Sequence, residues 1–172
     1  MASKMIFITG VSGTGKSTVC RELAERGYVT IGLDEVLGLS RWVHKETKEK
    51  LEKKADFSTE FLNTYEWACD LEMLQELLSQ REGEVFVAGN VENALECIML
   101  SEMSFALICS PETFLKRIDE REDNEYGKDE DAKKFLLSYY ESDNKKYTEA
   151  GAVAIDAEQP LVQVVESILA KI

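Results

Sequence analysis

The segment from Gly10 to Ser17 restricts the possible folds more than any other part of this chain. It reads GVSGTGKS and matches the pattern G-x-x-x-x-G-K-[ST]. The apolar run Met5 to Thr9 precedes it directly, and a helical pattern begins at Lys16. A strand, a glycine-rich turn and a helix in this order place backbone N–H groups around phosphate oxygens. The segment therefore predicts a phosphate-binding loop.

The chemistry of phosphate binding explains the residue types found in this loop. A Cβ at Gly13 or Gly15 would obstruct the backbone as it curls around phosphate. Lys16 supplies a positive charge to the β- and γ-phosphates, and the Ser17 hydroxyl can take a coordination position on Mg²⁺. The Thr18 hydroxyl can contact an outer phosphate. We expect ATP and Mg²⁺ as cofactors, with the metal at Ser17 and the nucleotide at Gly10, Ser12, Gly13, Thr14, Gly15, Lys16, Ser17 and Thr18.

The remaining pattern alternates strands and helices. Most of the strand-like runs are too uniformly apolar to have a wet face, and they cover residues 5–9, 28–31, 84–88, 105–109 and 152–155. Helical patterns cover residues 16–26, 36–54, 59–81, 111–121, 129–149 and 161–170. This alternation predicts the α/β class, with a five-stranded parallel sheet and helices on both of its faces. A length of 172 residues predicts one domain, residues 1–172.

Composition narrows the possible partners. The formal net charge of −13 repels polyanions, so we expect no nucleic-acid partner. No apolar run approaches the length of a membrane span, so we expect no membrane partner. We also expect a cytoplasmic protein that is a monomer or a weak dimer. The four cysteines lie far apart without a Cys-x-x-Cys pair, which predicts reduced core thiols.

The sequence lacks the further motifs that several other classes of nucleotide-binding protein require. A dinucleotide fingerprint read from Gly13 would need glycine where Thr18 stands, so NAD is disfavoured. A GTPase should show Asn-Lys-x-Asp and Asp-x-x-Gly, and neither is present. The strands that end at Ala88 and Cys109 lack the acid expected of an ATPase motor. The class that remains is the small kinases.

The sequence resembles P-loop small-molecule kinases of the shikimate kinase and adenylate kinase type. The segment Ile31 to Glu35 is similar to the Asp-x-Asp segment of shikimate kinases, with Asp34 at the second aspartate and Gly32 in place of the first. The segment from Ser110 onward resembles the helix that leads into a mobile lid. The resemblance implies a three-layer P-loop NTPase fold with an acceptor-covering region at about residues 36–81 and a lid at about 120–131.

The resemblance also implies roles for individual residues. Asp34 would act as a general base or orient the acceptor, although it could instead cap a helix that begins at Val36. Arg117 would lie at the nucleotide, and Arg121 would reach the transferred phosphate, unless both belong to a salt-bridged surface. Asp143 stands where shikimate kinases have an arginine, so shikimate is disfavoured. The catalytic residues we predict are Lys16, Asp34 and Arg121.

The predicted activity is transfer of the ATP γ-phosphoryl group to a small hydroxylated metabolite, such as a nucleoside, sugar or amino-alcohol. Two alternatives stay open: a nucleoside monophosphate kinase, and an ATP-binding regulatory module without metabolite turnover. Trp42 could line the acceptor pocket, Trp67 is assigned to core packing, and His44 is assigned to a solvated, non-catalytic position.

Overall fold

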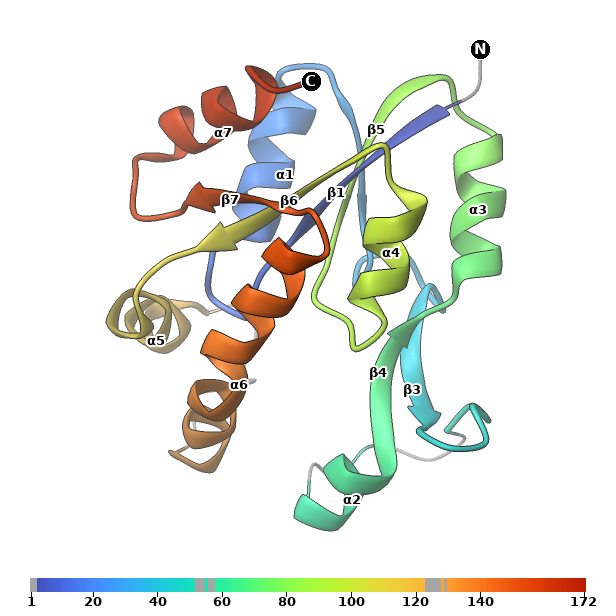
Figure 1. Cartoon of the computed structure of the whole chain (residues 1–172), viewed down its shortest axis with the longest axis vertical. Helices are drawn as coiled ribbons and strands as arrows, with labels where there is room; N and C mark the ends of the chain where they lie inside the picture. Colours follow the sequence, from blue (N-terminus) through green and yellow to red (C-terminus); the bar gives the residue numbers. More distant parts are fainter. Residues whose placement is uncertain (1–2, 52–54, 56–57, 123–127, 129) are drawn as a thin grey trace.

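The computed structural model describes residues 3–51, 55, 58–122, 128 and 130–172. Within these residues, five parallel strands form one sheet in the order β2-β5-β1-β6-β7, and β3 and β4 form a separate antiparallel hairpin (Figure 1). The strands are β1 Ser3–Thr9, β2 Val29–Gly32, β3 Ser40–His44, β4 Tyr65–Cys69, β5 Gly83–Ala88, β6 Met103–Ile108 and β7 Val153–Asp156. The helices are α1 Lys16–Glu25, α2 Thr59–Thr64, α3 Leu71–Ser79, α4 Ala94–Leu100, α5 Pro111–Glu120, α6 Glu130–Glu149 and α7 Leu161–Leu169.

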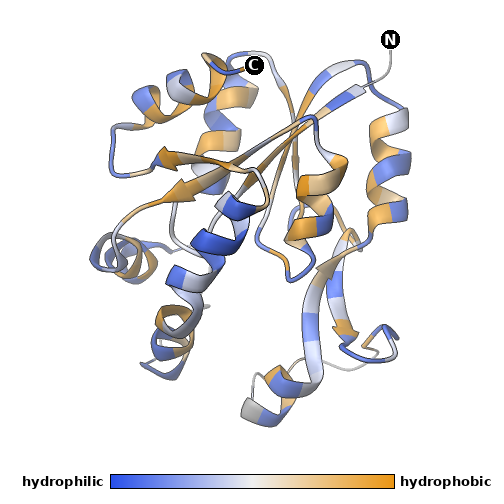
Figure 2. Cartoon of the chain, in the orientation of Figure 1, coloured by the Kyte–Doolittle hydropathy of each residue, from blue (hydrophilic) through white to orange (hydrophobic). Residues whose placement is uncertain are grey.

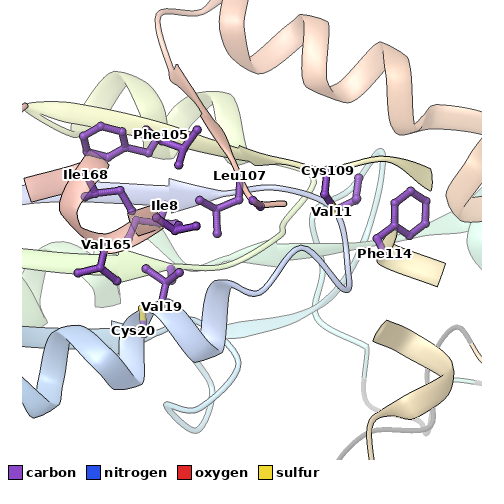
Figure 3. Close-up of a cluster of buried hydrophobic side chains, with 14 of the residues drawn as sticks. Ile8, Val11, Val19, Cys20, Phe105, Leu107, Cys109, Phe114, Val165 and Ile168 are labelled. Atoms are coloured by element: carbon purple, nitrogen blue, oxygen red, sulfur yellow. The ribbon is translucent and has the colours of Figure 1, made fainter. Parts of the chain in front are cut away.

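The side-chain period of two residues divides each buried strand between the two faces of the sheet. Ile6 and Ile8 of β1 pack with buried residues of α1 and α7, whereas Met5 and Phe7 pack with those of α3 and α4. Figure 2 shows apolar strands in the centre, and Figure 3 shows the cluster on the α1 and α7 face. Burial on both faces explains why these strands are continuous apolar runs. The predicted three-layer α/β fold is confirmed.

Two predicted helices are wrong. The stretch 36–54 contains turns and strand β3 in its described residues, and the stretch 59–81 contains α2, β4 and α3. The Lys- and Glu-rich composition favours a helix locally, but strand pairing between the two stretches overrides this local preference. Trp42 lies opposite Trp67 across the hairpin, with ring centroids 5.5 Å apart. Such cross-strand aromatic contacts stabilise a sheet.

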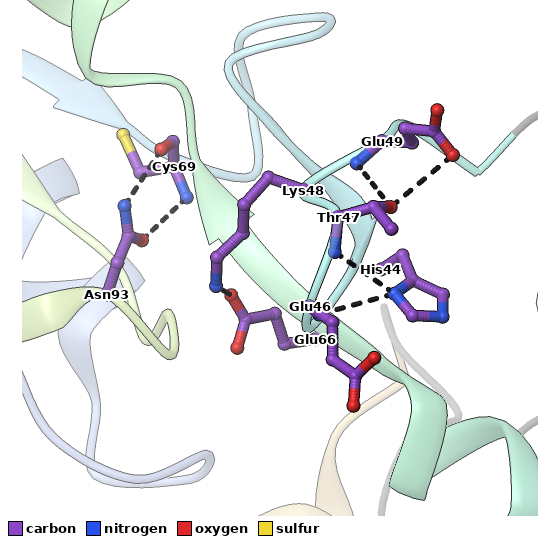
Figure 4. A network of polar contacts seen from close by, with 8 residues as sticks. All are labelled: His44, Glu46, Thr47, Lys48, Glu49, Glu66, Cys69 and Asn93. Carbon is purple, nitrogen blue, oxygen red and sulfur yellow. Dashed lines mark hydrogen bonds and ion pairs between the residues drawn. The ribbon is translucent and has the colours of Figure 1, made fainter.

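Helix α4, which we did not predict, holds the hairpin to the main domain. The Asn93 side chain accepts a hydrogen bond from the backbone N–H of Cys69 at 2.9 Å and donates one to its carbonyl at 3.0 Å (Figure 4). These two bonds join the last residue of β4 to the residue before α4. The hairpin is therefore fixed at its base, close to the carboxyl edge of the sheet.

Other predictions can be checked directly. All four cysteines belong to the described part of the chain, and each is buried and free, which confirms the core thiols. Pro111 is the first residue of α5, and Pro160 is the N-cap residue of α7. In the described ranges, no helix combines the length and the apolar character that a membrane crossing requires.

Candidate active site

The loop after β1 has the backbone geometry of a phosphate cradle. Gly10, Gly13 and Gly15 have φ angles of 142°, 87° and 99°, which L-residues rarely adopt. A Cβ at Gly13 would also lie 2.6 Å from the Phe114 carbonyl oxygen, whereas nothing lies within 4 Å of a Cβ at Gly15. Gly15 is therefore required for its backbone angle, and the space beside it is open. Helix α1 follows with no side-chain cap, which leaves its first N–H groups available to an anion.

Lys16 lies across this loop. Its Nζ donates hydrogen bonds to the carbonyl oxygens of Gly10 at 2.7 Å and Val11 at 3.0 Å. Desolvation lowers the pKa of Lys16 to about 8, and the nearby Asp34 carboxylate opposes that shift. The ammonium group is thus held over the loop in a place where phosphate oxygens would be better partners than neutral carbonyls.

Two arginines from the end of α5 contact the same loop. Arg117 donates to the Ala157 carbonyl oxygen at 2.8 Å and to the Thr14 carbonyl oxygen at 3.5 Å. Arg121 donates to the Ser12 hydroxyl at 3.2 Å. The two guanidinium groups therefore lie against the loop.

Asp34 lies just after β2, and its carboxylate accepts a 2.9 Å hydrogen bond from the Trp67 indole N–H. Because no helix begins at Val36, the alternative in which Asp34 caps such a helix is wrong. Trp67 both packs beside the α3 and α4 core and lines the site, so its assignment to core packing was only partly correct. Strand β4 of the hairpin thereby brings a hydrogen-bond donor to Asp34, the candidate general base.

A single cavity of about 920 Å³ connects these groups. Its volume is within the usual range for small-molecule sites. The first half of its lining comes from the phosphate-binding loop, α1, the end of α5 and the segment from Ala157 into α7, and consists of Ser12, Gly13, Thr14, Gly15, Lys16, Ser17, Thr18, Val19, Arg117, Arg121, Ala157, Gln159, Leu161 and Val164. Its other half is lined by Asp34, Trp42, Lys45, Leu62, Asn63, Tyr65, Glu66, Trp67, Asn90, Val91, Glu92, Phe135, Tyr139, Asp143, Lys146 and Tyr147.

The second half of the cavity has an acidic and aromatic wall. Among its described lining residues, the carboxylates are Asp34, Glu66, Glu92 and Asp143, and the cations are Lys45 and Lys146. Lys45 donates to the Leu62 carbonyl oxygen at 2.7 Å, and Glu66 is paired with Lys48 at 2.6 Å (Figure 4). The nearby Arg41 is not among the lining residues and forms an ion pair with Asp70.

Helix α6 contributes a buried polar corner to this wall. The Tyr147 hydroxyl donates to the Asn90 side-chain oxygen at 3.3 Å, and burial raises the pKa of Tyr147. Desolvation raises the pKa of Asp143, and the negative charge of Glu92 adds to that effect, while Lys146 opposes it. Ionisation of Asp143 is therefore unfavourable in this structure, and a positive ligand group beside it would remove that cost.

The raised pKa of Asp143 leads to a stability prediction. Protonated Asp143 stabilises the fold at pH values below the ordinary Asp pKa of about 3.9, and this contribution is lost as pH rises through the higher folded pKa. Asp143→Asn should therefore raise the melting temperature at pH 7 and change it little at pH 3.5. An effect of about 1 kcal/mol would be seen as about 2–4 °C.

Thermal unfolding at the two pH values, with Asp131→Asn as a surface control, measures this difference. Asp131 is exposed on the first turn of α6, so its variant should show no comparable gain. At each pH, the change in melting temperature is measured against the unsubstituted chain. A smaller change for Asp143→Asn at pH 7 than at pH 3.5 would contradict the prediction.

Most predicted site residues share the cavity. Gly10 is the exception, because it supports Lys16 through its carbonyl and does not line the space. The buried Thr14 hydroxyl donates to the Val11 carbonyl oxygen at 2.9 Å, so Thr14 can offer phosphate only its backbone. Of the predicted lid, residues 123–127 and 129, which include Gly127, are outside the described residues.

Sequence reasoning also missed functional candidates. Asn90, Glu92, Tyr139 and Tyr147 line the same cavity, and their spacing along the chain carries no motif. Gly89, which follows β5, is required for packing, since a Cβ there would lie 2.6 Å from the Leu33 side chain. His44 is partly buried, and its Nδ1 accepts from the Thr47 N–H at 3.3 Å within the turn after β3.

The described residues contain no cluster of three or more His, Cys, Asp or Glu side chains that could hold a metal ion by themselves. Mg²⁺ does not require one, because it commonly binds through one or two protein oxygens together with substrate phosphates and water. Ser17 is exposed at the start of α1, within the cavity that would hold those phosphates. The residues present thus fit Mg²⁺ that arrives with ATP.

Comparison with known proteins agrees with this geometry. Solved structures with the same fold include a shikimate kinase from Acinetobacter baumannii in complex with shikimate, with 18% identity, a TM-score of 0.61, and coverage of 98% of this chain and 94% of that one. A gluconokinase from Sinorhizobium meliloti has 22% identity and a TM-score of 0.57, with 97% and 90% covered. A deoxyadenosine kinase from M. mycoides with bound dATP has 16% identity and a TM-score of 0.58, with 96% and 97% covered.

At these identities the three structures establish the fold. No curated protein matches the sequence. The model of the family AAA_18, described as an AAA domain, matches residues 6–137, which is most of the chain and includes the phosphate-binding loop, Asp34, Arg117 and Arg121. The chain therefore belongs to the AAA_18 family and is a P-loop protein with the fold of the small-molecule kinases.

Proposed function

We propose that this protein transfers the γ-phosphoryl group of Mg·ATP to a hydroxyl group of a small metabolite. One observation carries the proposal: a single cavity joins the phosphate-binding loop to a second compartment with a carboxylate, Asp34, at their junction. Phosphoryl transfer needs chiefly such an alignment of donor and acceptor, together with positive charge around the transferred group.

Each group at the junction has a role in this reaction. Asp34 accepts the proton of the acceptor hydroxyl, whose oxygen attacks the γ-phosphorus as the bond to ADP breaks. Lys16 and Arg121 neutralise the charge on the transferred group, and Arg117 holds the nucleotide. Ser17 would hold the Mg²⁺ that arrives with ATP, and the ion would supply positive charge to the phosphates.

The wall of the second compartment favours an acceptor without a phosphate group. A phosphorylated acceptor is usually held by bidentate arginines, and the described arginines that line the cavity, Arg117 and Arg121, both lie against the phosphate-binding loop. The acidic side chains opposite would repel a second phosphate. This observation disfavours a nucleoside monophosphate kinase.

The same wall favours an acceptor that carries an amino group. An ammonium group can pair with Asp143 or Glu92 and can lie against an aromatic face such as Trp42. Ionisation of Asp143 would then become favourable. Among the hydroxylated metabolites we consider, amino-alcohols, amino-sugars and amine-bearing nucleosides match this chemistry best.

Paired acceptors test the proposal. Each amine-bearing compound is assayed beside its neutral or phosphorylated counterpart: an amino-sugar with the sugar, an amino-alcohol with the diol, a nucleoside with its monophosphate. ADP release above the acceptor-free rate is measured, and the phosphorylated product is identified by mass spectrometry. We expect turnover with unphosphorylated acceptors, and higher kcat/KM for the amine in the amino-sugar and amino-alcohol pairs. Turnover restricted to monophosphates would overturn the acceptor class, and ATP binding without turnover would favour a regulatory module.

The Trp67 indole should act through its hydrogen bond to Asp34. Trp67→Phe keeps an aromatic ring and removes the N–H donor, and a hydrogen bond to a charged group contributes about 1.5–3 kcal/mol. We expect kcat with a turned-over acceptor to fall roughly 10-fold or more, with ATP affinity unchanged.

A double-mutant cycle distinguishes this role from simple packing. If Trp67 acts through Asp34, the cost of Trp67→Phe should shrink when Asp34→Asn is already present. An equal cost in both backgrounds would show that the indole affects turnover by another route.

A further inference from the structure

The space beside Gly32 is filled by a carboxylate from the next turn. After β2 the chain reverses, and the N–H groups of Glu35 and Val36 donate to the Gly32 carbonyl oxygen at 3.1 and 3.3 Å. This turn folds the Glu35 side chain back over position 32. A Cβ at Gly32 would lie 2.6 Å from Glu35 Cδ and 2.7 Å from its Oε2. The φ angle of Gly32 is not in the left-handed region, so the close approach of Glu35 is what requires glycine there.

The two residues border a small cavity that also touches the phosphate-binding loop. Its volume is about 30 Å³, which is enough for about two water molecules. It is lined by Lys16, Ser17, Cys20, Gly32, Asp34, Glu35, Ala88 and Gly89. Ser17 at the start of α1 and Glu35 after β2 therefore face one water-sized space.

The other groups around this space leave the carboxylate available. Burial raises the pKa of Cys20 to about 12, and the charge of Glu35 adds to that effect, so the thiol stays neutral. Asp34 also borders this space, and its Oδ1 accepts the bond from the Trp67 indole N–H. Glu35 thus fills the space beside Gly32 with its carboxylate and borders the same small cavity as Ser17.

Mg²⁺ chemistry matches this arrangement. The ion keeps several of its waters in proteins, and carboxylates commonly hold those waters instead of replacing them. We propose that Glu35, seated in the space beside Gly32, binds the waters of the Mg²⁺ ion that Ser17 and the ATP phosphates coordinate. This inference rests on the proposed function, because the metal ion arrives with ATP.

Metal binding, and not turnover, provides the test. Glu35→Ala is titrated with Mg²⁺ by calorimetry in the presence of a non-hydrolysable ATP analogue, and with Mn²⁺ by electron paramagnetic resonance. Groups that orient metal ligands typically contribute 10- to 100-fold to metal affinity, so we expect a loss of roughly 10-fold or more. Affinity for the analogue in EDTA should be unchanged. Glu25→Gln, at the exposed end of α1, is the control for loss of one negative charge.

A second variant tests whether the position of the carboxylate matters as well as its charge. Adding Gly32→Asp to Glu35→Ala puts a carboxylate on the other side of the same space, and metal affinity should recover by at least several-fold. Unchanged metal affinity in Glu35→Ala, an equal loss in Glu25→Gln, or no recovery in the double variant would overturn the inference. Failure of the unsubstituted chain to bind the analogue with Mg²⁺ would instead overturn the proposed function.

Discussion

Lys16→Ala is expected to reduce phosphoryl transfer by at least about 10²- to 10³-fold, the usual effect of removing one group that stabilises transition-state charge. The Lys16 ammonium group lies over the phosphate-binding loop, where its partners in this structure are the carbonyl oxygens of Gly10 and Val11. Its pKa is lowered to about 8 by desolvation. Phosphate oxygens would supply the negative partner that the loop itself lacks.

The fold should survive this substitution, because Lys16 lies outside both hydrophobic core clusters. Unchanged circular dichroism together with lost ADP release would support the assignment. Lys145→Ala removes an exposed lysine of α6, paired with Glu149 at 3.7 Å, and should keep full activity. If Lys16→Ala transferred phosphate at the normal rate, the phosphate-binding role of the loop would be wrong.

The main sheet could be predicted because its signal is local. Parallel strands buried on both faces need continuous apolar runs, and β1 and β5 carry such runs between Met5 and Thr9 and between Val85 and Ala88. The loop after β1 is also local, since its glycines and Lys16 follow one another directly. Any sequence with these two features has few alternative folds.

The hairpin could not be predicted in the same way. The stretch Lys45 to Lys54 is rich in good helix formers, and this composition outweighed the strand pattern of the residues just before it. What makes β3 a strand is its partner: Trp42 packs against Trp67, twenty-five positions later, and Val43 pairs with Glu66. Non-local pairing of this kind leaves only a weak trace in a single sequence.

Two contacts of the candidate site could not be predicted from the sequence for the same reason. Trp67 and Asp34 are 33 positions apart and meet only in the folded chain, where Asn93 holds the end of β4 beside α4. The Glu35 carboxylate is close to Gly32 in sequence, but its importance depends on the cavity shared with Ser17. In both cases the tertiary fold, and not residue spacing, determines which groups face each other.

Asp34→Asn is expected to lower acceptor-dependent turnover by roughly 10²-fold or more, the usual contribution of a positioned general base. The asparagine amide oxygen can still accept the Trp67 indole N–H, so the geometry seen in the 2.9 Å bond should persist. The amide cannot take a proton from the acceptor hydroxyl. Affinity for an ATP analogue should stay within a few-fold, because Asp34 interacts with Lys16 only through space.

Single-turnover measurement of phosphoryl transfer separates the chemical step from binding. Glu76→Gln removes an exposed carboxylate of α3 and should leave both quantities unchanged. A collapse of nucleotide binding in Asp34→Asn, with little effect on transfer at saturating ATP, would place Asp34 at the metal ion instead of the acceptor. Asp34 and Glu35 would then share one role. The combination expected here, slow transfer with intact Mg·ATP binding in Asp34→Asn and weakened Mg²⁺ binding in Glu35→Ala, would assign the two neighbouring carboxylates to different substrates of one reaction.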